Sequence, residues 1–381
     1  MDFELSEEQE LALEAWRRFV ERDIKPITDP YRDMIIPKDT LKQLLGMTAP
    51  YGVGCGWVPE DGGGLGFDFL TSGLLYEELA SVSPDLAGAA FVNEGVAIKL
   101  YNTASPELKE RYLGPTLRGD LIGCTAVSEP NVGSNPREIQ THARRDGNDY
   151  RISGEKMWAS NSSLADYVVL LAKTDDQEFT IFLVDRDDHG FETREIEKLG
   201  LNGWSLGQII LDDVKVPAAN IMGGLGGGMR ETMKGFERSR CFISMVSLGI
   251  GRACLDASIA YAKEREQFGK PIGAHQLVQQ LIAEMATDHA AARLMVLRAL
   301  ALLDRKAGSN IEAAMAKVFA TEAVLRNTSK AIQVHGAFGI CREFPVERHF
   351  RNARMLTIPD GTTQINNLII GRILLGINAF S

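Results

Sequence analysis

The spacing of hydrophobic residues changes twice along the chain, and each change marks a change of secondary structure. Residues 1–119 read mostly as helix, because apolar positions recur every three to four residues. Residues 120–229 contain short β-rich runs separated by turn-forming residues. Residues 230–381 return to long helical periodicity after a glycine-rich stretch. The sequence therefore predicts a helical domain, a β domain and a second helical domain, an α+β chain.

The predicted elements follow this division. Helices are expected near Pro37–Met47, Phe69–Ser81 and Gly95–Asn102, after a first helix that ends before Pro26; strands at Tyr150–Ile152, Tyr167–Ala172, Thr180–Val184 and Gln208–Leu211; and helices at Phe242–Lys263, His275–Lys306, Ile311–Val334 and from about Gln364. No long helix separates the strands, so we expect an antiparallel sandwich or barrel.

Charge and composition exclude several classes of protein. The net charge is −10, and no basic cluster is present that would neutralise a run of phosphates, so nucleic-acid binding is not expected. No window approaches about 20 apolar residues and no apolar leader begins the chain, so neither membrane insertion nor export is expected. The five cysteines show no CxxC spacing, which indicates reduced thiols in a cytoplasmic compartment.

Common catalytic motifs are also missing from the sequence. The six histidines lack HxxxH or HExxH spacing, so no metal site is predicted. No GxSxG surrounds a serine, and no glycine-rich stretch completes GxGxxG after a strand. Serine-nucleophile and nicotinamide chemistry both lose support.

Three short stretches have compositions suited to ligand binding. Residues 124–135 combine hydroxyls, proline and glycine at the end of a β segment; residues 156–161 place Trp158 beside polar groups; and residues 357–364 place Asp360 in an irregular segment before a helix. Taken singly, each has an ordinary structural interpretation: a turn, a buried tryptophan and a helix cap.

Together with longer motifs, these stretches resemble the acyl-CoA dehydrogenase family. The segments on which this resemblance rests are Ala262–Pro271 with its Arg-x-x-Phe-Gly signature, then Gln276, Ala331–Gly339, Pro345–Arg348, Arg351 and Arg354. The resemblance covers essentially the whole chain. It implies the family's fold, with an N-terminal helical domain (1–119), a middle β domain (120–229) and a C-terminal four-helix bundle (230–381).

The resemblance also implies an FAD-dependent enzyme that desaturates an acyl-CoA thioester between its α and β carbons. This reaction needs a base for the α proton and an acceptor for the β hydride, and FAD supplies the acceptor. The implied FAD contacts are Thr125, Val127, Ser128, Trp158 and Ser160 at the flavin ring; Arg265 and Phe268 from a neighbouring subunit, with Gln333 and Ala337; and Thr362 and Gln364. Ser134, Arg240 and Gly361 are the implied substrate contacts. A homotetramer is implied, with an electron-transferring flavoprotein as electron acceptor.

One departure from the family pattern concerns the catalytic base. The family usually carries Tyr-Glu-Gly-Thr where this chain has Pro359-Asp360-Gly361-Thr362, so the implied base is Asp360. The alternative base position aligns with Ser239, which has no carboxylate. Because an aspartate reaches about 1.5 Å less far than a glutamate, and Pro359 leaves more room than tyrosine, we expect a cyclic or α-branched substrate such as a cyclohexanecarboxyl thioester.

Other interpretations remain open at this stage. The enzyme could run as an enoyl-CoA reductase, could act on a carrier-protein-bound acyl group, or could be a non-catalytic protein that binds flavin or acyl-CoA for assembly. Glu94 is either a second base, a polar selector in the acyl pocket, or a surface carboxylate at a helix end, of which we favour the last. Glu237 is interpreted as structural.

Overall fold

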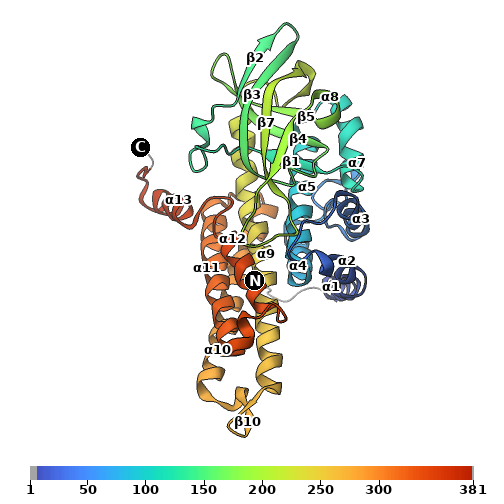
Figure 1. Cartoon of the computed structure of the whole chain (residues 1–381). Helices are drawn as coiled ribbons and strands as arrows, with labels where there is room; N and C mark the ends of the chain where they lie inside the picture. Colours follow the sequence, from blue (N-terminus) through green and yellow to red (C-terminus); the bar gives the residue numbers. More distant parts are fainter. Residues whose placement is uncertain (1–6, 380–381) are drawn as a thin grey trace.

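Helices, strands and helices follow one another in the predicted order, and they occupy different parts of an elongated molecule (Figure 1). The computed structural model describes residues 7–379. The sheet lies at one end, and the long C-terminal helices extend to the other end, where a small hairpin marks the tip (Figure 1). The N-terminal helices lie beside the long axis that joins these two ends (Figure 1).

The N-terminal helices surround two buried ones. The helices are α1 (Glu7–Phe19), α2 (Lys25–Thr28), α3 (Lys38–Thr48), α4 (Phe69–Val82), α5 (Pro84–Thr103), α6 (Pro106–Leu108) and α7 (Gly114–Leu117). Helices α4 and α5 are buried on nearly every face, because α4 packs against α9 and α5 packs against both α9 and the sheet. All three predicted helices of this region are present.

Proline is accommodated differently from the prediction. Helix α1 ends before Pro26, but the backbone continues through a π-helical turn at Val20–Ile24 directly into α2, which contains Pro26. A proline lacks an N–H and its ring clashes with the carbonyl four residues earlier, so an α-helix would break there. The wider π turn relieves this conflict. The same arrangement recurs at Lys109–Leu113 before Pro115.

The middle strands form one mixed sheet of eight strands in the order β6-β7-β3-β2-β4-β5-β8, with β1 also paired to β4. Their bounds are β1 (Gly123–Ala126), β2 (His142–Asp146), β3 (Asp149–Ser160), β4 (Tyr167–Thr174), β5 (Phe179–Asp185), β6 (Glu192–Glu195), β7 (Leu206–Pro217) and β8 (Ile221–Met222), with a short helix α8 (Arg186–His189) after β5. Most pairs are antiparallel as expected, but β1 and β2 both run parallel to β4. Hydrophobic periodicity reports the face that a residue occupies and not the neighbour of its strand, which is why the parallel pairs were not predicted.

The C-terminal helices are α9 (Gly228–Glu264), α10 (Gln276–Asp304), α11 (Asn310–His335), α12 (Val346–Leu356) and α13 (Thr363–Leu375), with a hairpin of β9 (Glu266–Gln267) and β10 (Lys270–Pro271) after α9. Helix α9 begins at Gly228, earlier than predicted. Its first turns are polar, so they lack the apolar periodicity on which the prediction depended. It is the one helix of the described chain long and apolar enough to cross a membrane, and 67% of its most apolar stretch is buried inside the protein. That burial is typical of a core helix.

Helices α4 and α9 approach closely at Gly249. A Cβ atom at this position would lie 2.5 Å from the Glu77 carbonyl oxygen and 2.7 Å from the Ala80 Cβ. Both neighbours are parts of α4 that cannot rotate away. The glycine therefore sets the spacing of α4 and α9.

Gly249→Ala is expected to lower the free energy of unfolding by about 1–3 kcal/mol, because the added methyl forces the two helices apart. Chemical denaturation measures the change. The control is Gly371→Ala in α13, where a Cβ meets nothing within 4 Å; removing this helical glycine should be neutral or stabilise by up to about 1 kcal/mol. Equal effects of the two substitutions would contradict the role of Gly249.

Candidate active site

Trp158 lies in a strained position near the C-terminal end of β3. Its φ is +62°, and the register between β3 and β7 shifts between Lys156 and Ala159, so it occupies a β-bulge. A bulky residue with positive φ is an outlier that persists only where the surroundings enforce it. The Trp158 side chain is nevertheless 54% exposed. The protein therefore presents a large aromatic ring to the outside at a conformational cost.

A buried ion pair supports this bulge. The ammonium of Lys156 lies 2.8 Å from a Glu129 carboxylate oxygen and donates to the Val127 carbonyl at 3.1 Å. The Met157 N–H donates to the Ser128 carbonyl at 2.9 Å. Burial lowers the pKa of Lys156 to about 8, although the attraction of Glu129 opposes this. The pair ties the bulge to the segment that follows β1.

The predicted flavin-ring residues are thus brought together. Thr125 lies near the end of β1, Ser160 ends β3 beside the bulge, and β1 and β3 are in contact. Val127 and Ser128 are the residues whose carbonyls receive the bonds just described. One end of the sheet therefore presents hydroxyls, backbone groups and an aromatic ring side by side.

A second group of predicted residues lies at the opposite end of the molecule. Phe268 and Gly269 form the two-residue turn between β9 and β10, with φ of +53° and +74°, and Phe268 is 94% exposed. The Arg265 guanidinium lies over the Phe338 ring at 5.8 Å from the ring centre, and Gln333 and Ala337 are exposed nearby. Helix α9 separates this tip from the sheet (Figure 1), and its 37 residues span about 55 Å. The two groups cannot contact one ligand within a single chain.

Asp360 lies between these two regions, in the segment that joins α12 to α13. Its φ is +56° and that of Gly361 is +90°. The Ser239 hydroxyl on α9 donates to the Asp360 side chain, and the Arg240 guanidinium donates to the Asp360 backbone carbonyl at 3.3 Å. Burial raises the pKa of Asp360, and Ser239 and the positive charges of Lys317 and Arg240 partly oppose that rise. This carboxylate is therefore a better proton acceptor than an exposed aspartate.

Lys317 lies beside the Asp360 segment, and its sequence pattern did not predict a place in the candidate site. Its side chain is fully buried in α11, and its ammonium donates to the carbonyls of Thr357 at 2.8 Å and Gly361 at 2.9 Å. The Asn366 amide donates to the same Gly361 carbonyl at 2.7 Å. Burial lowers the pKa of Lys317 to about 8, against the attraction of Asp360. The one sign of this burial in the sequence is that Lys317 is a lone lysine in the apolar run Ala313–Val318.

The remaining predicted residues have mixed surroundings. The Thr362 hydroxyl caps α13 by accepting from the Ile365 N–H at 3.2 Å, so Thr362 and not Asp360 is the helix cap. Gln364 and Ser134 are exposed. The Arg240 guanidinium is buried and also donates to Asn310 at 2.8 Å. The ligand contacts predicted for these residues stay predictions.

The preferred interpretation of Glu94 as a surface carboxylate is wrong. Glu94 is completely buried in the middle of α5, where it accepts hydrogen bonds from the Trp57 N–H at 2.7 Å, the Gly54 N–H at 3.3 Å and the Tyr76 hydroxyl at 2.6 Å. Burial raises the pKa of Glu94 to about 7. The polar residue type suggested exposure, but α5 is buried on all sides. Glu237 accepts from both Ser309 donors before α11, which agrees with a structural role.

Comparison with known proteins identifies the family. Residues 6–120, 124–214 and 226–375 match the models named Acyl-CoA dehydrogenase, N-terminal domain; Acyl-CoA dehydrogenase, middle domain; and Acyl-CoA dehydrogenase, C-terminal domain. The chain belongs to the acyl-CoA dehydrogenase family. Members of this family are FAD-dependent oxidoreductases that act on CH–CH bonds.

Individual relatives differ in substrate. The chain is 37% identical to "Probable acyl-CoA dehydrogenase YngJ" of Bacillus subtilis, over 98% of this chain and 100% of that protein. It is 40% identical to "Cyclohexane-1-carbonyl-CoA dehydrogenase" of Geobacter metallireducens, over 72% of this chain and 74% of that protein. A solved glutaryl-CoA dehydrogenase from Mycobacterium smegmatis in complex with FADH2 superposes with a TM-score of 0.92 at 28% identity, covering 99% of this chain and 97% of that one.

Lys156→Met is expected to destabilise the protein by about 3–5 kcal/mol, because it leaves the Glu129 carboxylate buried without its charge partner. Thermal unfolding of the FAD-loaded protein measures the loss. The control is the double variant Lys156→Met with Glu129→Gln, which removes both charges and should recover most of the stability. A double variant no more stable than the single one would show that the ion pair is not what holds the bulge.

Proposed function

We propose that this chain is an acyl-CoA dehydrogenase in which Asp360 removes the α proton of the thioester. The observation that carries this proposal is the partly buried carboxylate of Asp360, which accepts from Ser239, while Arg240 and Lys317 hold the backbone carbonyls of Asp360 and Gly361. A base of raised pKa on a fixed backbone segment is what abstraction of a weakly acidic C–H proton requires. The same carboxylate argues against a non-catalytic assembly protein.

The residues near Trp158 fit a planar cofactor. An exposed indole, held in a strained bulge beside the hydroxyls of Thr125 and Ser160, matches a ring system that needs both stacking and hydrogen bonds. When bound, FAD supplies the acceptor for the β hydride. We assign Thr125, Val127, Ser128, Trp158, Ser160, Thr362 and Gln364 to its binding within one subunit.

A second subunit would complete this site. Arg265, Phe268, Gln333 and Ala337 are exposed at the tip of the molecule, where their own chain offers no flavin-ring residues. We therefore assign them to the FAD of a neighbouring subunit, in a homotetramer. All four residues are already exposed, so they could contact the FAD of a neighbouring subunit without a change of conformation in the described chain.

The substrate we favour is a cyclic or α-branched acyl-CoA, such as cyclohexanecarboxyl-CoA. The short side chain of Asp360 and the small Pro359 beside it leave more room at the α carbon than a glutamate and a tyrosine would. The similarity to a relative named for cyclohexane-1-carbonyl-CoA supports this choice. Ser134, Arg240 and Gly361 are the proposed contacts to the CoA thioester.

Two alternatives use the same site. The reaction could run physiologically as enoyl-CoA reduction, which the relative named "Acryloyl-CoA reductase (NADH)" makes a specific candidate, or it could use a carrier-protein thioester. For the dehydrogenase direction we propose an electron-transferring flavoprotein as acceptor and a cytoplasmic location. Measuring flavin reduction by acyl-CoA against flavin oxidation by enoyl-CoA separates the two directions.

Asp360→Asn should slow flavin reduction by about 10²- to 10⁴-fold, because the amide keeps the size of the carboxylate but has no basicity. Anaerobic bleaching of the flavin with linear, branched and cyclic acyl-CoAs measures the rate. Asp360→Glu is the geometric control: its longer side chain should favour linear over cyclic substrates relative to the wild type. An undiminished rate in Asp360→Asn would place the base elsewhere.

Lys317→Met should move the acid limb of the rate–pH profile to higher pH. Only ionised Asp360 accepts the α proton, and below pH of about 8 the Lys317 charge favours that ionised form. Removing the charge raises the pKa of Asp360 further, so more alkaline conditions are needed for the same rate. Lys317→Arg, which keeps the charge, should restore the limb; a profile unmoved by Lys317→Met would contradict the electrostatic role.

A further inference from the structure

Helices α5 and α9 pack against each other, and we name the space beside Gly95, Lys99, Gly235 and Arg238 the groove. Phe91, Gly95 and Lys99 share one face of α5, because they are spaced four residues apart, and Gly235 and Arg238 lie on a common face of α9 with Phe242. The rings of Phe91 and Phe242 stack at 6.1 Å at one end of the groove. A Cβ at Gly95 or at Gly235 would meet nothing within 4 Å. Space is therefore open beside each of these glycines.

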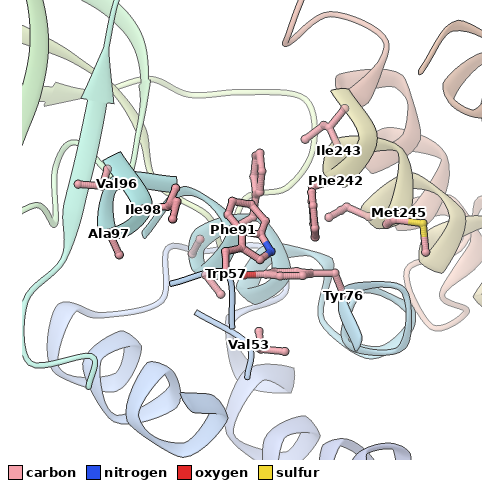
Figure 2. Packing of buried hydrophobic residues seen from close by; sticks show 14 of the residues in the cluster. Val53, Trp57, Tyr76, Phe91, Val96, Ala97, Ile98, Phe242, Ile243 and Met245 are labelled. Atoms are coloured by element: carbon pink, nitrogen blue, oxygen red, sulfur yellow. The ribbon is translucent and has the colours of Figure 1, made fainter. Parts of the chain in front are cut away.

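An aromatic cluster closes the end of the groove. Figure 2 shows Trp57, Phe91, Phe242 and Tyr76 gathered from different segments of the chain. The rings of Trp57 and Phe242 lie 4.3 Å apart. The indole N–H of Trp57 is buried and has no hydrogen-bond partner among the described residues. A buried donor without an acceptor is costly, and it indicates a missing partner.

Two positive charges line the same groove without acceptors. The Arg238 guanidinium lies over the Trp57 ring, 4.9 Å from its centre. In the described part of the chain, neither Arg238 nor Lys99 makes a hydrogen bond or an ion pair with a carboxylate. Burial lowers the pKa of Arg238 to about 10 and that of Lys99 to about 8, where repulsion by Arg238 contributes.

The nearest carboxylates are already engaged. Glu94 attracts Arg238 but forms no ion pair with it, and its oxygens accept three other hydrogen bonds. Glu231 attracts Lys99 from the other end of the groove but pairs with Arg230 and Lys234. Both cations are half-buried, and a cation that has lost part of its hydration gains from pairing with an anion. An anion from outside the chain would supply the pairing.

The groove adjoins the catalytic segment. Arg238 precedes Ser239 and Arg240 on α9, and these two residues contact Asp360. We propose that Arg238 and Lys99 bind a carboxylate on the acyl group itself, remote from the thioester, so that the substrate is an acyl-CoA with a second acidic group. This inference rests on the proposed function, since it names the acyl class that reaches Asp360. The aromatic cluster would contact the hydrocarbon part of that group.

The test compares thioesters that differ only in the remote carboxylate. Adipoyl-CoA is compared with hexanoyl-CoA, and 4-carboxycyclohexanecarboxyl-CoA with cyclohexanecarboxyl-CoA, by anaerobic flavin reduction in the holoenzyme. The acidic member of each pair should show a kcat/KM about 10- to 100-fold higher, the value of charge-assisted hydrogen bonds. Arg238→Met and Lys99→Met should each reduce that ratio toward one.

The controls separate this inference from the proposed function. Arg326→Met removes an exposed arginine of α11 and should leave the ratio unchanged, whereas Arg238→Lys should keep part of it. The inference is overturned if uncharged thioesters reduce the flavin but acidic ones gain no advantage, or if Arg238→Met weakens all acyl-CoAs equally, which would place the CoA moiety in the groove. If none of the thioesters reduces the flavin, the proposed function itself fails.

Discussion

The close packing of α4 against α9 is the constraint on which the other elements depend. Gly249 allows the two helices to approach, and buried carboxylates of α4 then reach three neighbours. Glu78 pairs with Arg17 of α1 and with Arg252 of α9, and Glu77 pairs with Arg293 of α10. Because each of these carboxylates is buried, losing one arginine would leave a charge poorly compensated. Through these ion pairs, α4 holds α1 in place on one side and α9 and α10 of the C-terminal bundle on the other.

Three consecutive residues of α9 also contact three different parts of the candidate site. Successive residues of an α-helix point about 100° apart, so Arg238, Ser239 and Arg240 face different surroundings. Arg238 lies against Trp57, Ser239 contacts the Asp360 side chain, and Arg240 reaches the Asp360 carbonyl and Asn310. A break in α9 would displace all three contacts together. A continuous helix therefore positions the contacts to both Asp360 and Trp57.

The sequence predicted the order of helical and β regions and most helices and strands, because these depend on local periodicity. The roles of Trp158 and Asp360 rest on motif and stay predictions. The sequence did not predict the parallel pairing of β4 or the π turn before Pro26, which depend on neighbours distant in the chain. The largest misses are buried charges. Glu94 and Lys317 have residue types typical of surfaces, and only the packing of α5 and α11 shows that they are enclosed.

The backbone at residue 360 offers a physical reason for aspartate there. A φ of +56° lies in the left-handed region, which aspartate enters at lower cost than most residues because its short polar side chain bonds locally. A glutamate at this position would gain reach but lose that local compatibility. The Ser239 hydroxyl meets the shorter carboxylate from α9, and the Lys317 ammonium holds the following carbonyl. The left-handed backbone, the short carboxylate and its two neighbours are therefore consistent with one another.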